Sequence, residues 1–133
     1  MKPIFSPKNN PRVIIIQILY GKYYNNDQNI IIPKHRFKKF IKDVVSGTLE
    51  RSDLIEETIN SHLSKDIDLI KTDKLLKIIL FAAIFELLFK HNNPKNVVIS
   101  EYVLASEYFL EKVQIGYLNA ILDKISKVLR KDE

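Results

Sequence analysis

Apolar residues recur along most of this chain at the spacing of an α-helix. Between residues 37 and 45 they fall at positions i, i+3, i+4, i+7 and i+8, which places them on one face. Between residues 118 and 129 the same 3.6-residue repeat returns, with lysine, serine and aspartate at the polar positions. Alternation of the strand kind is almost absent. The pattern predicts an all-α fold of about six helices, and no linker divides residues 1–133 into separate domains.

Single residues predict where some of these helices begin and end. Gly47 follows the first apolar face and is expected to end that helix. Ser52 is expected to cap the next helix, whose buried stripe is formed by Ile55, Ile59 and Leu63.

The run RVIIIQILY at residues 12–20 is rich in β-branched residues and by propensity alone suits a strand. We interpret it as a helix because no second strand-like segment lies nearby to pair with it. Further along the chain, Pro94 precedes another helix that is expected to begin around Val97.

The stretch KIILFAAIFELLFK, residues 77–90, is the most apolar part of the chain. A membrane-spanning helix needs about 20 predominantly apolar residues. The run from Leu75 to Phe89 has fifteen positions, and Lys77 and Glu86 both interrupt it. A charge in such a span costs several kcal/mol on insertion. We therefore interpret the run as the central helix of a water-soluble bundle rather than as a membrane span.

Two interpretations of Glu86 are open at this point. On a helix it would form an ordinary surface ion pair with Lys90 at i, i+4, which stabilises a helix by about 0.2–0.5 kcal/mol. Alternatively, Ala82 and Ala83 beside it make a flat, open face that another helix or a partner protein could approach closely.

Composition excludes several classes of function. There is no cysteine, so neither a disulfide framework nor a thiolate metal site can form, which fits a reducing cytoplasm. The three histidines are far apart without helical partners, and three glycines cannot build a phosphate-binding loop, so we expect neither a metal site nor a catalytic one. The start has no apolar core of signal-peptide length. A net charge of +5 permits nucleic-acid binding without establishing it.

Five short motifs stand in one order along the chain: RVIIIQILY at 12–20, FIKDVVSG at 40–47, LFAAIFEL at 80–87, NVVISEYVLASEYF at 96–109 and YLNAILDKI at 117–125. In this order they resemble the motifs of the NusB transcription-antitermination family, from about residue 8 to residue 128. The resemblance implies two packed three-helix halves, no catalysis and no cofactor. It also implies binding of the boxA segment of ribosomal RNA leader transcripts, together with the small-subunit ribosomal protein NusE, within an RNA polymerase antitermination complex in the cytoplasm.

The resemblance carries over to particular positions. For RNA binding it implies Lys2, Lys8, Arg12, Gln17, Tyr20, Tyr117 and Asn119. For docking of the protein partner it implies Phe85, Glu86 and Lys90, on a face of the core helix that is kept open.

Some departures from the family pattern bear on function. The Arg-rich start of the family is reduced to SPKNNPR, which should weaken RNA binding because phosphate neutralisation supplies much of the affinity. Phe81 stands where the family usually has an arginine, whereas Tyr117 keeps a ring able to stack on a base. A second hypothesis is therefore a helical protein-interaction module that has lost RNA recognition. A homodimer through the RNA-binding face is a further alternative. The sequence contains no methyltransferase domain, so we expect no methyl transfer.

A second basic cluster follows the polar loop at residues 25–29. It consists of Lys34, Arg36, Lys38, Lys39 and Lys42, with Phe37, Phe40 and Ile41 expected to turn inward between them. A solvated helix face is the favoured interpretation. The alternative is an electrostatic track for an RNA backbone that replaces part of the missing arginines.

Overall fold

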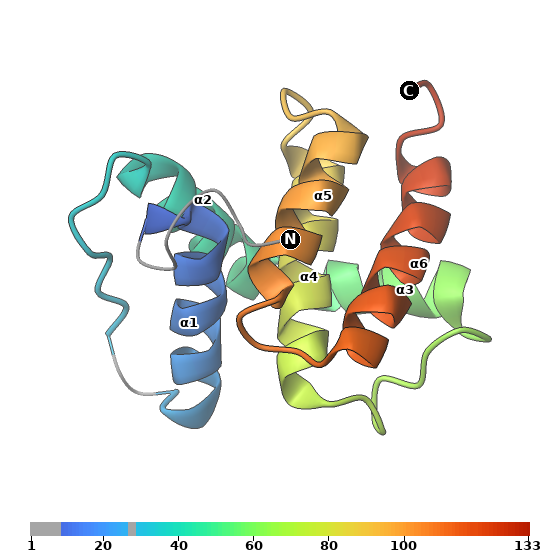
Figure 1. The fold of residues 1–133 in the computed structure, drawn as a ribbon, viewed down its shortest axis with the longest axis horizontal. Helices are drawn as coiled ribbons and strands as arrows, with labels where there is room; N and C mark the ends of the chain where they lie inside the picture. Colours follow the sequence, from blue (N-terminus) through green and yellow to red (C-terminus); the bar gives the residue numbers. More distant parts are fainter. Residues whose placement is uncertain (1–8, 27–28) are drawn as a thin grey trace.

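The computed structural model describes residues 9–26 and 29–133, which form six α-helices and no strand (Figure 1). The helices are α1 (Pro11–Tyr24), α2 (Lys38–Glu50), α3 (Ser52–Leu63), α4 (Lys74–Phe89), α5 (Lys95–Ser106) and α6 (Lys112–Leu129). The predicted all-α fold is confirmed, and so is the helical interpretation of residues 12–20.

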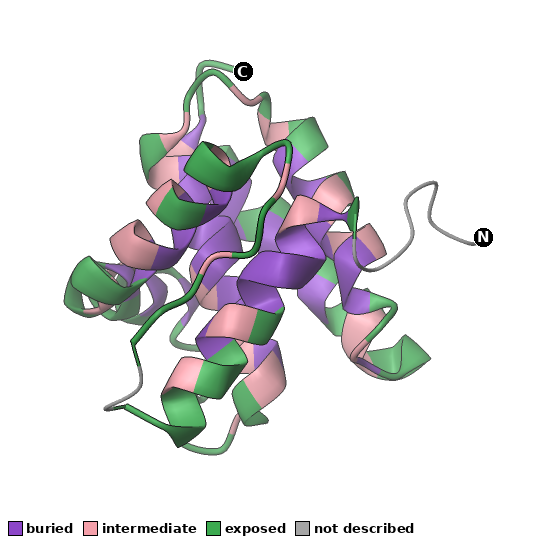
Figure 2. Ribbon diagram, turned by 90° about the vertical axis from the view of Figure 1, so that its left-hand side faces the viewer, coloured by how far each residue is buried: buried purple, intermediate pink, exposed green. Residues whose placement is uncertain are grey.

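Helix α4 is the centre of the fold. It packs against each of the other five described helices, and α5 and α6 also pack against each other. Figure 2 shows the buried residues gathered on the sides where helices face one another. The core-helix interpretation of residues 77–90 is confirmed, and among the described helices none is long and apolar enough to cross a membrane. The expected open alanine face is wrong, because Ala82 and Ala83 are fully buried.

Helix α1 overcomes its β-branched composition through its cap and its buried face. Pro11 occupies the first turn, where its missing N–H costs nothing. The side chain of Asn10 accepts hydrogen bonds from the backbone N–H groups of Arg12 and Val13, at 2.9 and 3.3 Å. The apolar residues of the run then lie in the core, where burial outweighs a weak local preference for strand.

Two predicted helix boundaries are wrong. Helix α2 continues through Gly47 to Glu50, and Ser52 is the first residue of α3 rather than its cap, because Arg51 holds that position without a side-chain hydrogen bond. Gly47 instead serves packing. A Cβ atom added there would lie 2.1 Å from Cζ of Phe85, so the absence of a side chain is what admits the ring of Phe85 against α2.

The C-terminal end of α4 is capped by a side chain from after α6. Arg130 is buried, and its guanidinium donates hydrogen bonds to the backbone carbonyls of Leu87, Glu86, Lys90 and Asn93 at 2.6 to 3.2 Å. These carbonyls belong to the last turn of α4 and the residues just after it, and those of Glu86 and Lys90 also accept the backbone N–H groups of Lys90 and Asn93. Arg130 therefore fixes the connection between α4 and α5 to the end of α6.

Candidate nucleic-acid interface

Three exposed tyrosines gather at the C-terminal end of α1. The sequence YGKYY places Tyr20, Tyr23 and Tyr24 within one turn of the helix. The rings of Tyr20 and Tyr24 meet edge to face with centroids 4.8 Å apart, and those of Tyr23 and Tyr24 with centroids 5.2 Å apart. The hydroxyl of Tyr20 donates to that of Tyr24 at 3.3 Å, and this bond raises the pKa of Tyr20. The cluster presents flat aromatic surface to solvent.

The N-terminal end of α4 places lysines beside this cluster. Asp73 caps α4 by accepting a hydrogen bond from the N–H of Leu76 at 3.2 Å. The next residue, Lys74, donates a hydrogen bond to the hydroxyl of Tyr23, and its Nζ lies 4.4 Å from the centroid of that ring. The hydrogen bond raises the pKa of Lys74 and keeps its charge at the surface.

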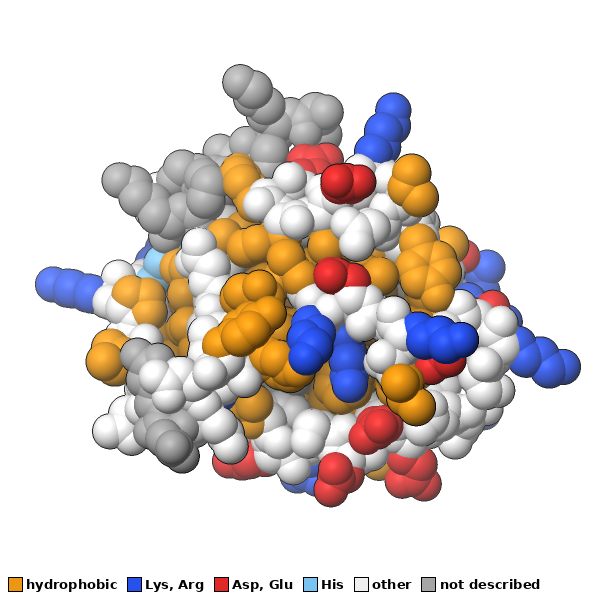
Figure 3. Space-filling model, turned by 90° about the horizontal axis from the view of Figure 1, so that it is seen from below, with side chains coloured by type: hydrophobic (Ala, Val, Ile, Leu, Met, Phe, Trp, Pro, Cys, Tyr) orange, Lys and Arg blue, Asp and Glu red, His pale blue; other side chains and the backbone are white. Residues whose placement is uncertain are grey.

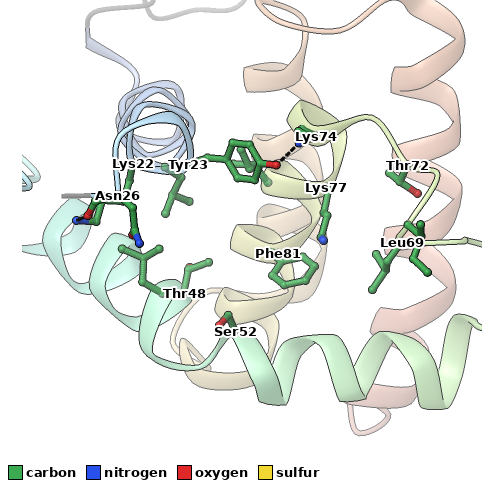
Figure 4. Close-up of a pocket in the computed structure, with 14 residues that line it drawn as sticks. Lys22, Tyr23, Asn26, Thr48, Ser52, Leu69, Thr72, Lys74, Lys77 and Phe81 are labelled. Carbon is green, nitrogen blue, oxygen red and sulfur yellow. Dashed lines mark hydrogen bonds between the residues drawn. The ribbon is translucent and has the colours of Figure 1, made fainter. Parts of the chain in front are cut away.

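A groove of about 600 Å³ opens between the C-terminal end of α1 and the N-terminal end of α4 (Figure 4). Apolar side chains form much of its wall, among them Leu19, Leu69, Ile78 and Phe81. Three lysines, Lys22, Lys74 and Lys77, also line the groove. The space-filling view of this end of the molecule shows apolar side chains gathered at its centre with basic side chains among them (Figure 3). The groove thus combines an apolar wall with cations.

Thr48 is one of the residues that line the same groove. Its hydroxyl is buried and finds no hydrogen-bond partner among the described residues. Buried polar groups are ordinarily paired, and an unpaired one costs free energy.

Helix α6 carries the other predicted aromatic contact. Tyr117 is exposed, and its hydroxyl donates to the backbone carbonyl of Asp66 at 2.5 Å. Partial burial of the hydroxyl raises the pKa of Tyr117, and the negative charge of Asp66 raises it further. Lys124 pairs with the same aspartate at 2.7 Å. Tyr117 is therefore held neutral and in place against the α3–α4 connection.

The predicted RNA-contacting residues divide into three groups. Gln17 is exposed and shares with Tyr20 the stripe of α1 that ends in the tyrosine cluster, while Tyr117 and Asn119 are exposed on α6. Arg12 is buried within the fold. Lys2 and Lys8 lie outside the described residues.

Four side chains of this surface were not predicted from the sequence: Tyr23, Tyr24, Lys74 and Lys77. The three tyrosines around one lysine in YGKYY were the signal for the first two. Only the packing of α4 against α1 brings the two lysines beside them.

Glu86, predicted to face a protein partner, is instead fully buried and paired with Arg12. The Nε and Nη2 atoms of Arg12 donate to the two carboxylate oxygens at 3.0 and 2.7 Å, and Nδ2 of Asn93 donates at 3.3 Å. Burial lowers the pKa of Arg12, but the nearby carboxylate outweighs this and leaves it raised. The expectation of an uncovered charge on α4 is wrong, because the N-terminal end of α1 covers it.

The predicted ion pair between Glu86 and Lys90 is also wrong. Lys90 turns to α2, where its Nζ lies 3.4 Å from Oδ2 of Asp43. Phe85 is 6% exposed, whereas Phe89, one turn later, is 38% exposed and lies under the guanidinium of Arg51 at 5.0 Å. These side chains border a shallow hollow of about 520 Å³ between α2 and α4. Of the predicted partner residues, Lys90 and Phe85 line this hollow and Glu86 does not.

The observations so far describe an all-helical protein with an aromatic and basic groove at one end and no group of acidic or histidine residues among the described residues placed to hold a metal ion. Comparison with known proteins gives the family. The NusB family matches residues 9–127, and the chain belongs to the NusB family.

Curated relatives agree with this assignment. The transcription antitermination protein NusB of Rhodopseudomonas palustris strain HaA2 is 36% identical over 94 residues, which are 71% of this chain and 56% of that protein. The protein of the same name from Rickettsia typhi is 35% identical over 118 residues, covering 85% of this chain and 75% of the relative. The match spans little more than half the length of several of these relatives.

A solved structure of NusB from T. maritima has the same fold. It superposes with a TM-score of 0.77 over 96% of this chain and 93% of that one, at 23% identity. This similarity concerns the arrangement of the helices.

Proposed function

We propose that this protein is a transcription antitermination factor that binds single-stranded boxA-type RNA together with the ribosomal protein NusE. The observation that carries the proposal is the end of the molecule where exposed tyrosines of α1 stand beside lysines of α4 at a groove of about 600 Å³. Sequence-specific RNA recognition targets unpaired bases, which stack on aromatic rings and enter pockets, while lysines hold the phosphates. The surface supplies both kinds of contact.

Roles follow from where the side chains lie. Tyr20 and Tyr24 would stack on bases, and Lys74 and Lys77 would hold neighbouring phosphates. These contacts offset part of the affinity that the thinned Arg-rich start removes.

The protein partner would dock on the hollow between α2 and α4. Its exposed ring, Phe89, and the charged side chains of Arg51, Asp43 and Lys90 offer an apolar contact with a polar border. Glu86 would act from below this surface, by fixing the end of α4 through its pair with Arg12.

The test is fluorescence anisotropy on a 5′-labelled boxA-type single-stranded RNA, with and without NusE, at two KCl concentrations. The change is the double substitution Lys74→Gln and Lys77→Gln, which should weaken binding and reduce its salt dependence by about 0.7 per lost phosphate contact. The matched control is Lys127→Gln with Lys131→Gln, which removes the same charge from the far end of α6 and should leave the affinity nearly unchanged.

Each result has a meaning. Salt-dependent binding that tightens with NusE supports an antitermination factor. Absence of RNA binding at low salt, with or without NusE, would reject the proposal. The protein would then be a NusB-fold interaction module. Arg12 favours this alternative, because it was predicted to bind RNA but is buried and paired with Glu86.

A further inference from the structure

Five cations form a strip at the N-terminal end of α2, whose C-terminal residues Thr48 and Leu49 line the groove. The basic strip consists of Lys34, Arg36, Lys38, Lys39 and Lys42, on the segment before α2 and on the first turns of that helix. All five are exposed, and the run from residue 29 to residue 42 contains no acidic residue.

The strip differs from Lys90, Lys124 and Lys127 in having no acidic partner. Lys90, Lys124 and Lys127 are each paired with an aspartate of the fold. Among the described residues, no carboxylate forms an ion pair with a member of the strip. The nearest acid along the helix, Asp43, is occupied by Lys90. The strip therefore keeps its positive potential.

Its position on α2 adds to this potential. Lys38 and Lys39 are the first two residues of the helix, and Phe37 before them makes no side-chain capping bond. Cations at a helix N-terminus are unfavourable, because the macrodipole is positive there. These two lysines therefore destabilise α2. A helix face that is merely solvated does not explain why lysines occupy these two positions. An anion bound across the strip would reverse the sign of the effect.

An aromatic ring is exposed within the strip. Phe37 was expected to turn inward, but it precedes the helix and is 40% exposed, with the guanidinium of Arg36 5.2 Å from its centroid. His35 lies beside the same ring at 5.9 Å and contacts the carbonyl of Asn9 at 3.1 Å. A base can stack on such a ring while the surrounding cations hold the backbone. The combination favours single-stranded nucleic acid over an anionic lipid surface, which would use the charge alone.

We propose that the basic strip is a second, sequence-independent RNA contact, in which its lysines hold phosphates and Phe37 stacks on an unpaired base. This inference depends on the proposed function in one respect only, namely that the bound polyanion is RNA. Its place beside the N-terminal end of α1, through the contact of His35 with Asn9, puts it at the opposite end of α1 from the tyrosine cluster. RNA that extends beyond the segment at the groove would reach it.

The experiment uses the full chain and a labelled 16-nucleotide oligouridylate, titrated at several KCl concentrations. The variant Lys38→Gln with Lys39→Gln should bind about tenfold more weakly at low salt, with a salt slope reduced by about 1.4. Its melting temperature should not fall, because two unfavourable charges leave the helix N-terminus. Phe37→Leu should lose about fivefold or more without a change of slope. The control, Lys127→Gln with Lys131→Gln, removes the same charge and should match the wild type.

Separate outcomes decide the two proposals. Loss of oligouridylate binding in the strip variants, with no preference of the wild type for boxA RNA, would support the strip and reject boxA recognition. Unchanged affinity and slope in the strip variants for both RNAs would overturn the strip while leaving boxA recognition intact. Weaker binding of the strip variants to phosphatidylglycerol vesicles, with RNA binding unchanged, would also overturn it.

Discussion

Arg12 and Glu86 form a buried ion pair that joins the first turn of α1 to the last turn of α4. The carboxylate is 0% exposed and Arg12 is 8% exposed, and two hydrogen bonds at 2.7 and 3.0 Å link them. The guanidinium also lies 5.0 Å from the centroid of Phe40 and 5.4 Å from that of Tyr102. Burial first, and then the nearby carboxylate, raise the pKa of Tyr102 well above its usual value. The pair therefore sits in an apolar environment where either charge alone would be costly.

Removing one member of this pair should destabilise the protein strongly. Glu86→Gln leaves the guanidinium of Arg12 buried without a counterion, and the free energy of unfolding should fall by about 3–5 kcal/mol. Urea unfolding followed by circular dichroism measures it. Glu107→Gln, at an exposed position, is the control and should change stability by less than about 0.5 kcal/mol.

A double variant separates the charge from the packing. Arg12→Met with Glu86→Leu removes both charges and should recover most of the lost stability. If Glu86→Gln unfolds at the same urea concentration as the wild type, the pair contributes little, and a direct role of the carboxylate in partner binding becomes the better account.

Gly47 should not tolerate even one added methyl group. Gly47→Ala places Cβ within 2.1 Å of the ring of Phe85, so the ring must move, and the variant should lose about 1–3 kcal/mol of stability. Thermal melting measures the loss. Gly116→Ala, also within a helix but with open space around its Cβ, should be stabilised by about 0.5–1 kcal/mol through helix propensity. Equal behaviour of the two variants would contradict the tight contact.

The anchoring of Glu133 makes part of the stability depend on pH. Its carboxylate accepts hydrogen bonds from Arg130 and from the backbone N–H of Lys95, and these lower the pKa of Glu133 below 4.5. A carboxyl group with a lowered pKa stabilises the fold above its unfolded pKa and loses this contribution as the pH falls through the folded one.

The corresponding measurement compares the wild type with Glu133→Gln. The melting temperature of the wild type should be the higher at pH 6, and the difference should close progressively below about pH 4.5. A difference that is constant between pH 6 and pH 3 would show that the charge of Glu133 has no part in holding Arg130.

Tyr117 should contribute its ring to RNA binding and its hydroxyl to the fold. Tyr117→Phe removes the hydrogen bond to the carbonyl of Asp66 and should cost about 0.5–1.5 kcal/mol of stability, with RNA affinity unchanged. Tyr117→Ala should lower RNA affinity by about 1–3 kcal/mol as well. Anisotropy with boxA-type RNA and thermal melting distinguish the two effects. Equal RNA affinity of the alanine variant and the wild type would remove Tyr117 from the proposed interface.

The sequence by itself determined the helices and their buried faces. Ile55, Ile59 and Leu63 are fully buried as their spacing predicts, because a helix fixes which side chains share a face before any partner is known. The apolar run of α4 likewise indicated a helix that others must cover. The order of motifs pointed to the family for the same reason, since motifs are local.

Only the tertiary structure decided what covers each face. Glu86 has Lys90 as its neighbour along the helix, but the packing of α1 brings Arg12 to it across 74 residues. Gly47 has the local signature of a helix end, yet the ring of Phe85 requires it inside α2. The hydrogen bond from Lys74 to the hydroxyl of Tyr23 likewise joins two helices that are far apart in the sequence. Such contacts join residues far apart in sequence. A local pattern determines which side of a helix is apolar, but not which distant side chain packs against that side.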